Sequence, residues 1–191
     1  MYYHEFVEVY HTLSSTTKRL EKTVILADFL KELHRKGESE WVYLLRGRVF
    51  PDYDARELGI STQLIMKTFS RAFGVSLSKV VSDFNKKGDL GSLAEIYAEQ
   101  RKQKALFSQK LEVKKVFQNL RMLSNAEGKG AVDKKIALVS ELLSFATGEE
   151  AKYLVRTVLS DLRVGVADAL LIDALAHAFF KDQEQLRTLL E

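Results

Sequence analysis

The chain has 191 residues, of which 46% are hydrophobic and 29% are charged, and its formal net charge is +3. A chain of this length and composition can bury a proper core, which argues against disorder. The absence of cysteine excludes disulfides, thiolate metal sites and cysteine nucleophiles. No apolar run approaches the roughly 18 residues of a membrane helix, and Glu5 and Glu8 interrupt the apolar start, so we expect neither a membrane span nor a secretory signal.

Hydrophobic residues recur at helical spacing along the chain, without convincing strand alternation. The predicted helices, in chain order, are residues 2–12, 18–35, 40–49, 61–73, 76–87, 90–101, 113–125, 132–146, 149–161, 167–180 and 183–190. No linker rich in Ser, Gly or Pro divides the chain. The sequence therefore predicts an all-α fold of about 10–12 helices in one compact domain.

Residues that start and stop helices occur where this assignment needs them. The predicted N-caps are Thr16 or Thr17, Ser61, Ser76, Asp133 and Thr147. The glycines expected at helix ends or turns are Gly37, Gly74, Gly88 and Gly148. The only proline, Pro51, opens "PDYD", which we interpret as a turn between two helices.

One pattern occurs twice in the chain. "LADFL", "EWVYLLRGRVF" and "ELGISTQLIMKTFSRAF" are matched in order by "LVSELL", "EEAKYLVRTVLSDL" and "VGVADALLIDALAHAF". At an offset of 106 positions, Gly59 coincides with Gly165 and Phe73 with Phe179. Shared helical periodicity explains matching apolar positions but not matching glycines. We therefore predict an internal pseudo-two-fold repeat, with half-repeats at about 18–75 and 130–182, each of three helices.

Positive charge is concentrated in one segment. Residues 101–135 hold ten Lys or Arg against three Asp or Glu, so this segment carries +7 and the remainder about −4. Clustered basic charge suits a polyanionic partner. The alternative is a solvated helix face with no partner.

Each matched glycine precedes a predicted helix start. Glycine leaves the backbone open to close approach, and a helix N-terminus presents unpaired N–H groups and the positive end of the dipole, a combination that binds phosphate. The donors would be the amides of residues 60–62 with two hydroxyls, and those of residues 166–168 beside Arg163. Two such turns could grip both backbones of a duplex, with little sequence preference. The alternative for each glycine alone is a routine helix connection.

Two loops extend this hypothesis. "NKKGDLGSLAE" places two lysines at a helix end before Gly88 and Gly91, and "EGKGAVDKK" is a Gly-Lys-Gly loop leading into a basic helix start. The second loop lacks the full glycine-rich pattern of nucleotide hydrolases, so ATP binding is not supported. Each loop alone is more often an ordinary helix connection.

Together, "LRVGVA", "KKGDLGSLAE", "VFPDYDARELGI", "EEAKYLVRTVLSDLRVGV" and the opening residues 1–30 resemble the N-terminal DNA-binding domain of archaeal-type ATP-dependent DNA ligases. The resemblance covers essentially the whole chain. It implies an all-helical, pseudo-symmetric domain that binds nicked duplex DNA in the minor groove through backbone phosphates, during replication, repair and recombination. The predicted DNA-binding residues are Gly59, Ser61, Thr62, Lys86, Lys87, Gly88, Gly91, Lys129, Gly130, Lys134, Lys135, Arg163, Gly165 and Val166.

The resemblance also shows what is missing. Such ligases attack ATP, with Mg²⁺, through the lysine of a Lys-x-Asp-Gly motif, and this chain has none. The four histidines show no metal spacing, and no pair of aspartates is convincingly catalytic. We therefore expect a monomeric, non-catalytic fragment without cofactor, metal or membrane contact. The parent would be a cytoplasmic, nucleoid-associated archaeal enzyme using ATP and Mg²⁺.

"QKALF" resembles the short motif with which archaeal ligases bind a sliding clamp of the PCNA type. Its clamp-binding residues would be Gln103, Lys104, Leu106 and Phe107. It lacks the second aromatic residue of the full pattern. The alternative is that Leu106 and Phe107 pack on the domain's own core.

Two other functions remain as alternatives. One is a helical protein–protein scaffold whose basic face meets an acidic partner, and the other is a stand-alone DNA-binding repair module. The dependence of binding on salt separates DNA binding from apolar docking.

Overall fold

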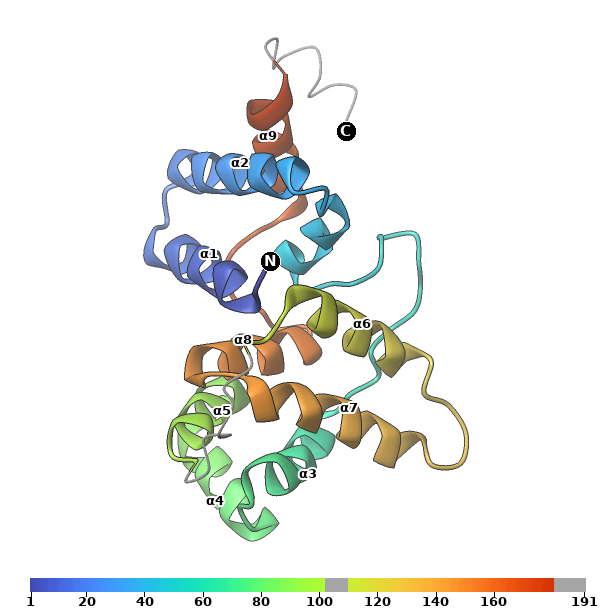
Figure 1. Ribbon diagram of the computed structural model, residues 1–191. Coiled ribbons are helices and arrows are strands. Elements are labelled where there is room, and N and C mark those ends of the chain that lie inside the picture. Colours follow the sequence, from blue (N-terminus) through green and yellow to red (C-terminus); the bar gives the residue numbers. More distant parts are fainter. Residues whose placement is uncertain (102–109, 181–191) are drawn as a thin grey trace. The chain divides into compact units, whose positions relative to one another are not determined.

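The structure is a computed structural model that describes residues 1–101 and 110–180 (Figure 1). The described part of the chain is helical, which confirms the predicted fold class. Its helices are α1 (Tyr3–Ser15), α2 (Arg19–Arg35), η1 (Ser39–Arg46), α3 (Thr62–Phe73), α4 (Leu77–Lys87), α5 (Leu90–Glu99), α6 (Val113–Ser124), α7 (Ala131–Phe145), α8 (Gly148–Val158) and α9 (Asp168–Phe179). The helix predicted at 183–190 lies outside the described residues.

Most predicted boundaries agree with the structure to within a few residues. Ser61, Ser76 and Thr147 are N-caps whose side chains accept backbone N–H groups, and Thr147 forms a capping box with Glu150. Gly74 and Gly88 end α3 and α4 in the left-handed conformation, as expected of C-cap glycines.

Four local predictions were wrong. Lys18 precedes α2 without a side-chain cap, while Thr16, two residues earlier, accepts its N–H instead. The N-cap of α7 is Gly130, and Asp133 lies in the first turn of that helix. Gly148 begins α8 rather than ending α7. The segment 40–49 forms the shorter 3-10 helix η1, whose three-residue turn places buried Trp41 and Leu44 on one face.

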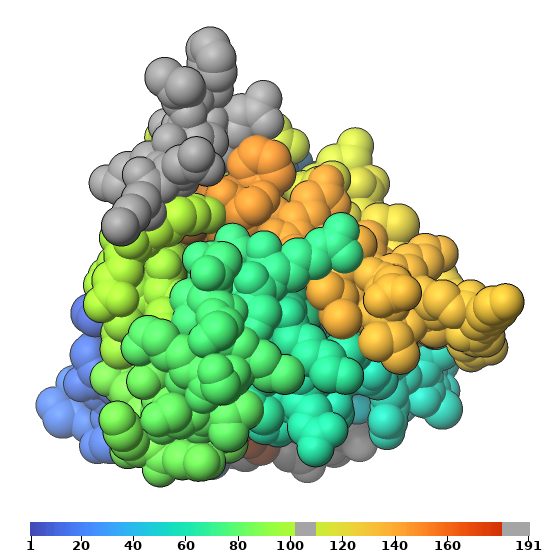
Figure 2. Space-filling view, turned by 90° about the horizontal axis from the view of Figure 1, so that it is seen from below, coloured from blue at the N-terminus to red at the C-terminus, as the bar shows by residue number. Residues whose placement is uncertain are grey.

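Contacts divide the chain into two compact units. The first comprises Met1–His4 and Gly47–Leu162. In it α5 packs against α8, and α7 packs against both α3 and α6. Figure 2 shows the surface of α3 (teal) beside that of α7 (gold to orange). The fully buried residues that hold α3, α6 and α7 together include Ile65, Phe69, Leu120, Leu123 and Leu143.

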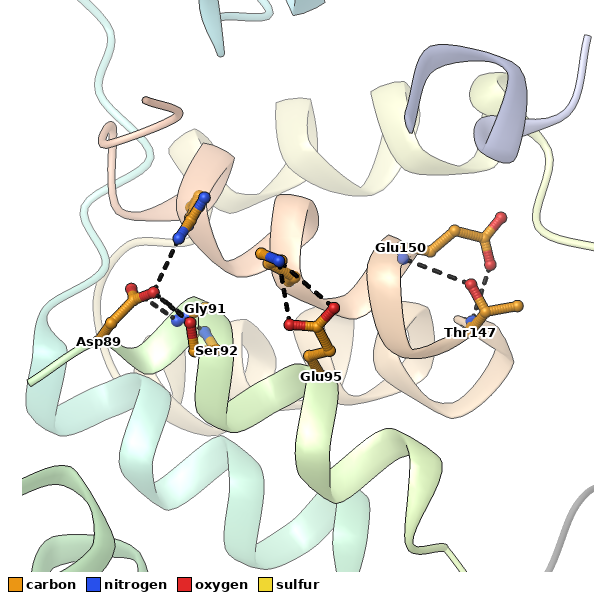
Figure 3. A network of polar contacts seen from close by, with 8 residues as sticks. Asp89, Gly91, Ser92, Glu95, Thr147 and Glu150 are labelled. Carbon is orange, nitrogen blue, oxygen red and sulfur yellow. Dashed lines mark hydrogen bonds and ion pairs between the residues drawn. The ribbon is translucent and has the colours of Figure 1, made fainter. Parts of the chain in front are cut away.

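A polar network joins α5 to α8 within this unit (Figure 3). The Asp89 side chain caps α5 by accepting the N–H groups of Gly91 and Ser92, and Arg156 of α8 donates to it at 2.8 Å. Burial raises the pKa of the Asp89 carboxyl, but the hydrogen bonds from Ser92 and Arg156 outweigh this effect and hold the pKa well below its usual range. One turn further along, Lys152 pairs with Glu95 at 3.0 Å.

The second unit comprises Glu5–Arg46 and Arg163–Glu191, of which the structure describes residues up to 180. Here α2 packs against α9, and the two helices cross in Figure 1. The Phe6 and Phe29 rings meet edge to face at 4.8 Å, and the buried Tyr10 hydroxyl donates to the Leu44 carbonyl at 2.7 Å. These contacts tie α1, α2 and η1 together.

The two units do not coincide with the two predicted half-repeats. Helix α3 ends the first half-repeat but packs on α7, which begins the second; α9 ends the second but packs on α2, which begins the first. The burial pattern also aligns the first helices, because Leu26, Ala27, Phe29 and Leu30 are buried in the same order as residues 139, 140, 142 and 143. The repeat itself stays a prediction, under which α3 and α9 would be third helices exchanged between the units.

Candidate nucleic-acid interface

The first glycine turn lies between an irregular segment and α3, in the first unit. Gly59 has φ +60° and is exposed. Ser61 follows as the N-cap and accepts the Leu64 N–H at 3.2 Å, while Thr62 begins α3. The Lys135 ammonium, from the first turns of α7, donates to the carbonyl oxygens of Leu58 and Gly59, both at 3.0 Å. The structure thus brings together Gly59 and Lys135, which the sequence places on the same surface.

Arginine–aromatic contacts hold the segment that leads into this turn. The Arg121 guanidinium donates to the Val49 carbonyl at 3.0 Å and lies 5.6 Å from the centre of the Phe50 ring. Arg56 lies over the same ring at 4.1 Å and binds both carboxylate oxygens of Asp54. The hydrogen bonds from Arg56 lower the pKa of the Asp54 carboxyl to about 2. The segment is therefore fixed at its start, although no helix runs through it.

The second glycine turn precedes α9, in the second unit. Gly165 has φ +68° and is exposed, while Val164 before it is buried. Arg163 is exposed and has φ +58°, a conformation that few side-chain-bearing residues adopt and that often marks a functional segment. The Lys22 ammonium of α2 donates to the Val164 carbonyl at 2.9 Å.

The start of α9 is acidic but neutralised. Ala167 is the N-cap and has no side-chain cap, so the first N–H groups of α9 lack the serine acceptor that α3 has. Asp168, in the first turn, pairs with Arg46 of η1 at 2.5 Å. Since the carboxylate is paired with a cation of its own unit, it adds little net negative charge beside the turn.

The two turns, which belong to different units, are each held by the same kind of contact. Lys22 and Lys135 occupy equivalent positions of α2 and α7, four residues before Leu26 and Val139, and each binds the carbonyl preceding its glycine. A Cβ built on either glycine would lie 2.6 Å from the lysine Nζ. Lys22 was not among the residues predicted from the sequence, although aligning the first helices of the half-repeats would have identified it.

The loop after α4 agrees only in part with the sequence prediction. Lys86, Lys87 and Gly88 are exposed, and the two lysines line an open hollow with Tyr97 of α5. Gly91, however, is buried: its N–H donates to Asp89, and its Cα faces the Arg156 side chain. The backbone there is used for packing α5 on α8, so Gly91 is not part of the exposed surface.

The loop before α7 is exposed and rich in glycine. Gly128 and Gly130 both have positive φ, and the side chains of Lys129 and Lys134 are exposed. The loop extends at the right-hand edge of Figure 2. It leads to Lys135, so this loop and the Gly59 turn are linked through one side chain.

The described residues of the basic segment 101–135 do not form one charged face. Arg101 donates to the last carbonyls of α7, Arg121 stacks on Phe117 at 4.3 Å, and Lys115 pairs with Glu141 at 2.6 Å. Among the described residues of the segment, Lys114, Lys129 and Lys134 are exposed, as is Lys110, whose ammonium lies 5.3 Å from the centre of the Tyr2 ring. Charge counted along the sequence therefore overstates the charge available to a partner. The clamp-motif residues Gln103, Lys104, Leu106 and Phe107 lie outside the described residues.

The described residues hold no cluster of His, Cys, Asp or Glu that could ligate a metal ion. Nor does any helix among them have the length and apolar character needed to cross a bilayer.

Comparison with known proteins identifies the family. The sequence pattern of the family described as DNA ligase N terminus matches residues 2–176. The DNA ligase of Methanothermobacter thermautotrophicus is 43% identical over 180 residues, which cover 94% of this chain and 32% of that ligase. The DNA ligase of Thermococcus onnurineus is 39% identical over 179 residues, covering 94% and 32%, and that of Nitrosopumilus maritimus is 33% identical over 180 residues, covering 94% and 31%.

This chain thus spans about a third of the length of these curated relatives. A family match over most of the chain, together with relatives at these identities, establishes that it belongs to the DNA ligase N-terminus family.

Proposed function

We propose that this chain binds nicked duplex DNA through backbone phosphates in the minor groove, as the N-terminal part of an ATP-dependent DNA ligase. Membership of the family supports the DNA ligase role. The observation that carries the binding mode is the pair of exposed glycine turns, each at a helix start and each held by a lysine.

Each turn offers what a phosphate oxygen needs. Within the described part of the chain, the N–H groups of Gly59 and Gly165 have no hydrogen-bond acceptor. Without a Cβ the backbone can approach the phosphate closely, and the following helix adds the positive end of its dipole. Arg163 beside the second turn and Lys134 near the first add charge that steers and holds a polyanion.

Binding of this kind is independent of sequence. Phosphate contacts fix the position of a protein on the duplex but carry no base information. A ligase has to act wherever a nick occurs, so backbone recognition suits the task. Holding both sides of a nick would also keep the ends in reactive geometry for the catalytic part of the enzyme.

Fluorescence anisotropy with labelled nicked duplexes of two unrelated sequences tests the proposal. We expect the same affinity for both sequences and a steep fall with salt, with a slope in log Kobs against log salt of about −0.9 per phosphate contacted. Lys134→Ala should make the slope less negative by about 0.9 on both duplexes. Lys114→Ala, which removes an exposed lysine of α6 outside the proposed surface, serves as the matched control.

Three outcomes would contradict this function. A strong preference for one duplex would point to base readout. Binding that is absent at low salt, together with a nearly salt-independent complex with a protein partner, would favour the helical scaffold. Equal affinity for nicked and intact duplex would favour a stand-alone DNA-binding repair module.

We also propose that the chain does not catalyse ligation. It contains no Lys-x-Asp-Gly lysine to receive AMP from ATP. A nick-sealing assay with ATP and Mg²⁺ should give no product with this chain alone. Any turnover would place an active site within these residues.

A contact with a sliding clamp is proposed from the sequence motif alone. Phe107→Ala should abolish binding to a clamp while leaving the melting temperature within about 1 °C, because a docking side chain contributes to an interface rather than to the core. A fall of several degrees would assign Phe107 to the core instead.

A further inference from the structure

We propose that Lys22 and Lys135 are paired positioning residues that orient the two glycine turns for DNA, each acting on the half-repeat that does not contain it. This inference rests on the proposed function, since it concerns how the same turns are held. Neither lysine would contact a phosphate directly. For Lys135 this replaces the direct phosphate contact that the sequence suggested.

The geometry of the peptide unit carries the argument. A trans peptide is planar, and its C=O and N–H point in opposite directions. Lys135 draws the carbonyls of Leu58 and Gly59 towards α7, which turns the N–H groups of Gly59 and Ile60 away from that helix. Lys22 draws the Val164 carbonyl towards α2 in the same way and so turns the Gly165 N–H outward.

The lysines also crowd these two glycine positions. A side chain at either position would be strained by the positive φ, and its Cβ would lie 2.6 Å from the lysine Nζ. Gly74 has a similar φ of +68°, and a Cβ there would meet nothing within 4 Å. Gly47 is the other positive-φ glycine with a neighbour, Leu162 Cβ at 3.2 Å, so among these glycines an approach below 3 Å occurs at the two lysine-held turns.

The ammonium suits this task because it donates in several directions at once. Lys135 uses two of its three donors on consecutive carbonyls, so the turn is fixed at two successive peptide units. A methionine has similar length but no donor. Lys→Met substitution would therefore let these peptide units rotate while keeping the apolar contacts of the stem.

The decisive experiment measures nicked-duplex affinity across a salt series for Lys22→Met and Lys135→Met. If the turn is competent about a tenth of the time without its lysine, affinity falls about tenfold at every salt concentration. The lines in log Kobs against log salt should stay parallel to that of the unaltered chain. Lys31→Met on α2 and Lys134→Met on α7 remove the same charge from lysines that hold no turn.

Lys31→Met should leave affinity nearly unchanged, and Lys134→Met should make the slope less negative. A slope less negative by about 0.9 in Lys22→Met or Lys135→Met would make these lysines direct phosphate contacts and overturn the positioning role. Unchanged affinity in both variants, with the unaltered chain binding well, would overturn it while leaving the proposed function standing. If the unaltered chain fails to bind DNA, the proposed function and the positioning role are both wrong.

A second measurement does not depend on how the variants fold. In ¹H–¹⁵N spectra of the unaltered chain, titration with nicked duplex should shift the Gly59 and Gly165 amide signals strongly, and the Gly74 amide signal little. Signals of Gly59 and Gly165 that do not move at saturation would mean that their N–H groups do not meet DNA, and the inference would be wrong.

Discussion

Arg46 at the end of η1 pairs with Asp168 in the first turn of α9, with its Nη2 atom 2.5 Å from Oδ1. Both residues belong to the second unit: Arg46 is the last residue of its first chain segment, and Asp168 lies near the start of its second. It also neutralises an acidic side chain three residues after Gly165, where the proposed phosphate would lie. A carboxylate in that place favours the helix but opposes an anion, so the arginine decides the net charge of the turn.

Removing this arginine should weaken DNA binding. The Arg46→Met substitution removes the cation that pairs with the Asp168 carboxylate beside the turn. We therefore expect affinity for nicked duplex to fall about three- to tenfold at low salt. Adding Asp168→Asn should restore most of the loss, because it removes the repelling charge. Anisotropy on the two variants measures both effects, and a double variant no better than Arg46→Met would show that the arginine acts in another way.

Alanine at a lysine-held glycine should affect more than stability. Gly74→Ala and Gly165→Ala meet the same strain, since both glycines have φ +68°. Each should lower the free energy of unfolding by about 1 kcal/mol. Only Gly165→Ala should also weaken DNA binding, because its Cβ displaces the Lys22 ammonium.

Urea unfolding and anisotropy on the same two samples give the comparison. Non-additivity adds a second check: in a chain that already carries Lys22→Met, Gly165→Ala should reduce affinity much less than in the unaltered chain. Equal losses of affinity in Gly74→Ala and Gly165→Ala would remove the special role of the lysine.

The Asp89 carboxylate should make stability depend on pH in the acid range. Its pKa in the folded chain lies below the usual value, so its stabilising contribution is complete above the unfolded pKa of about 4 and is lost as the pH falls towards the folded pKa. Replacing it by alanine removes both the cap of α5 and the partner of Arg156. We expect a loss of about 2 kcal/mol at pH 7.

The difference between the unaltered chain and Asp89→Ala should shrink when urea unfolding is repeated near pH 3. Thr147→Ala is the matched control: it removes the hydroxyl cap of α8, which does not titrate. A difference for Asp89→Ala that stays constant with pH would mean that the carboxylate acts only through its shape.

Neither half of the chain should fold alone, because each contains helices whose packing partners lie in the other half. A fragment of residues 1–101 contains α3 without α7 and α2 without α9. We expect weak helical circular dichroism and no cooperative melting from this fragment. Mixing it with residues 102–191 should restore both. A cooperative transition in the first fragment by itself would contradict the exchange of third helices.

Helices, their caps and the glycine turns were largely predictable from the sequence. The helical pattern of α3, its Ser61 cap and its Gly74 end are all fixed by residues within a few positions of one another. The 3-10 form of η1 was not predictable, since the same apolar spacing fits an α-helix. The cap of α7 was missed because Asp133 is a residue type typical of N-caps, while Gly130 has no side chain that could indicate a capping role.

The candidate site was predicted in outline but not in its contacts. The sequence pointed to Gly59, Gly165 and the loop before α7, all of which are exposed. It also included Gly91, which is buried, and it omitted Lys22.

The sequence by itself determined that the chain is all-helical, where its two glycine turns lie and which family it resembles, because periodicity, capping and motifs are properties of neighbouring residues. Only the tertiary structure decided which lysine holds which turn, which arginines bind carbonyls and rings of the same unit, and that α3 packs on α7 and α9 on α2. Those contacts join residues 77 and 142 positions apart, and no local pattern encodes a pairing that exists only once helices have packed.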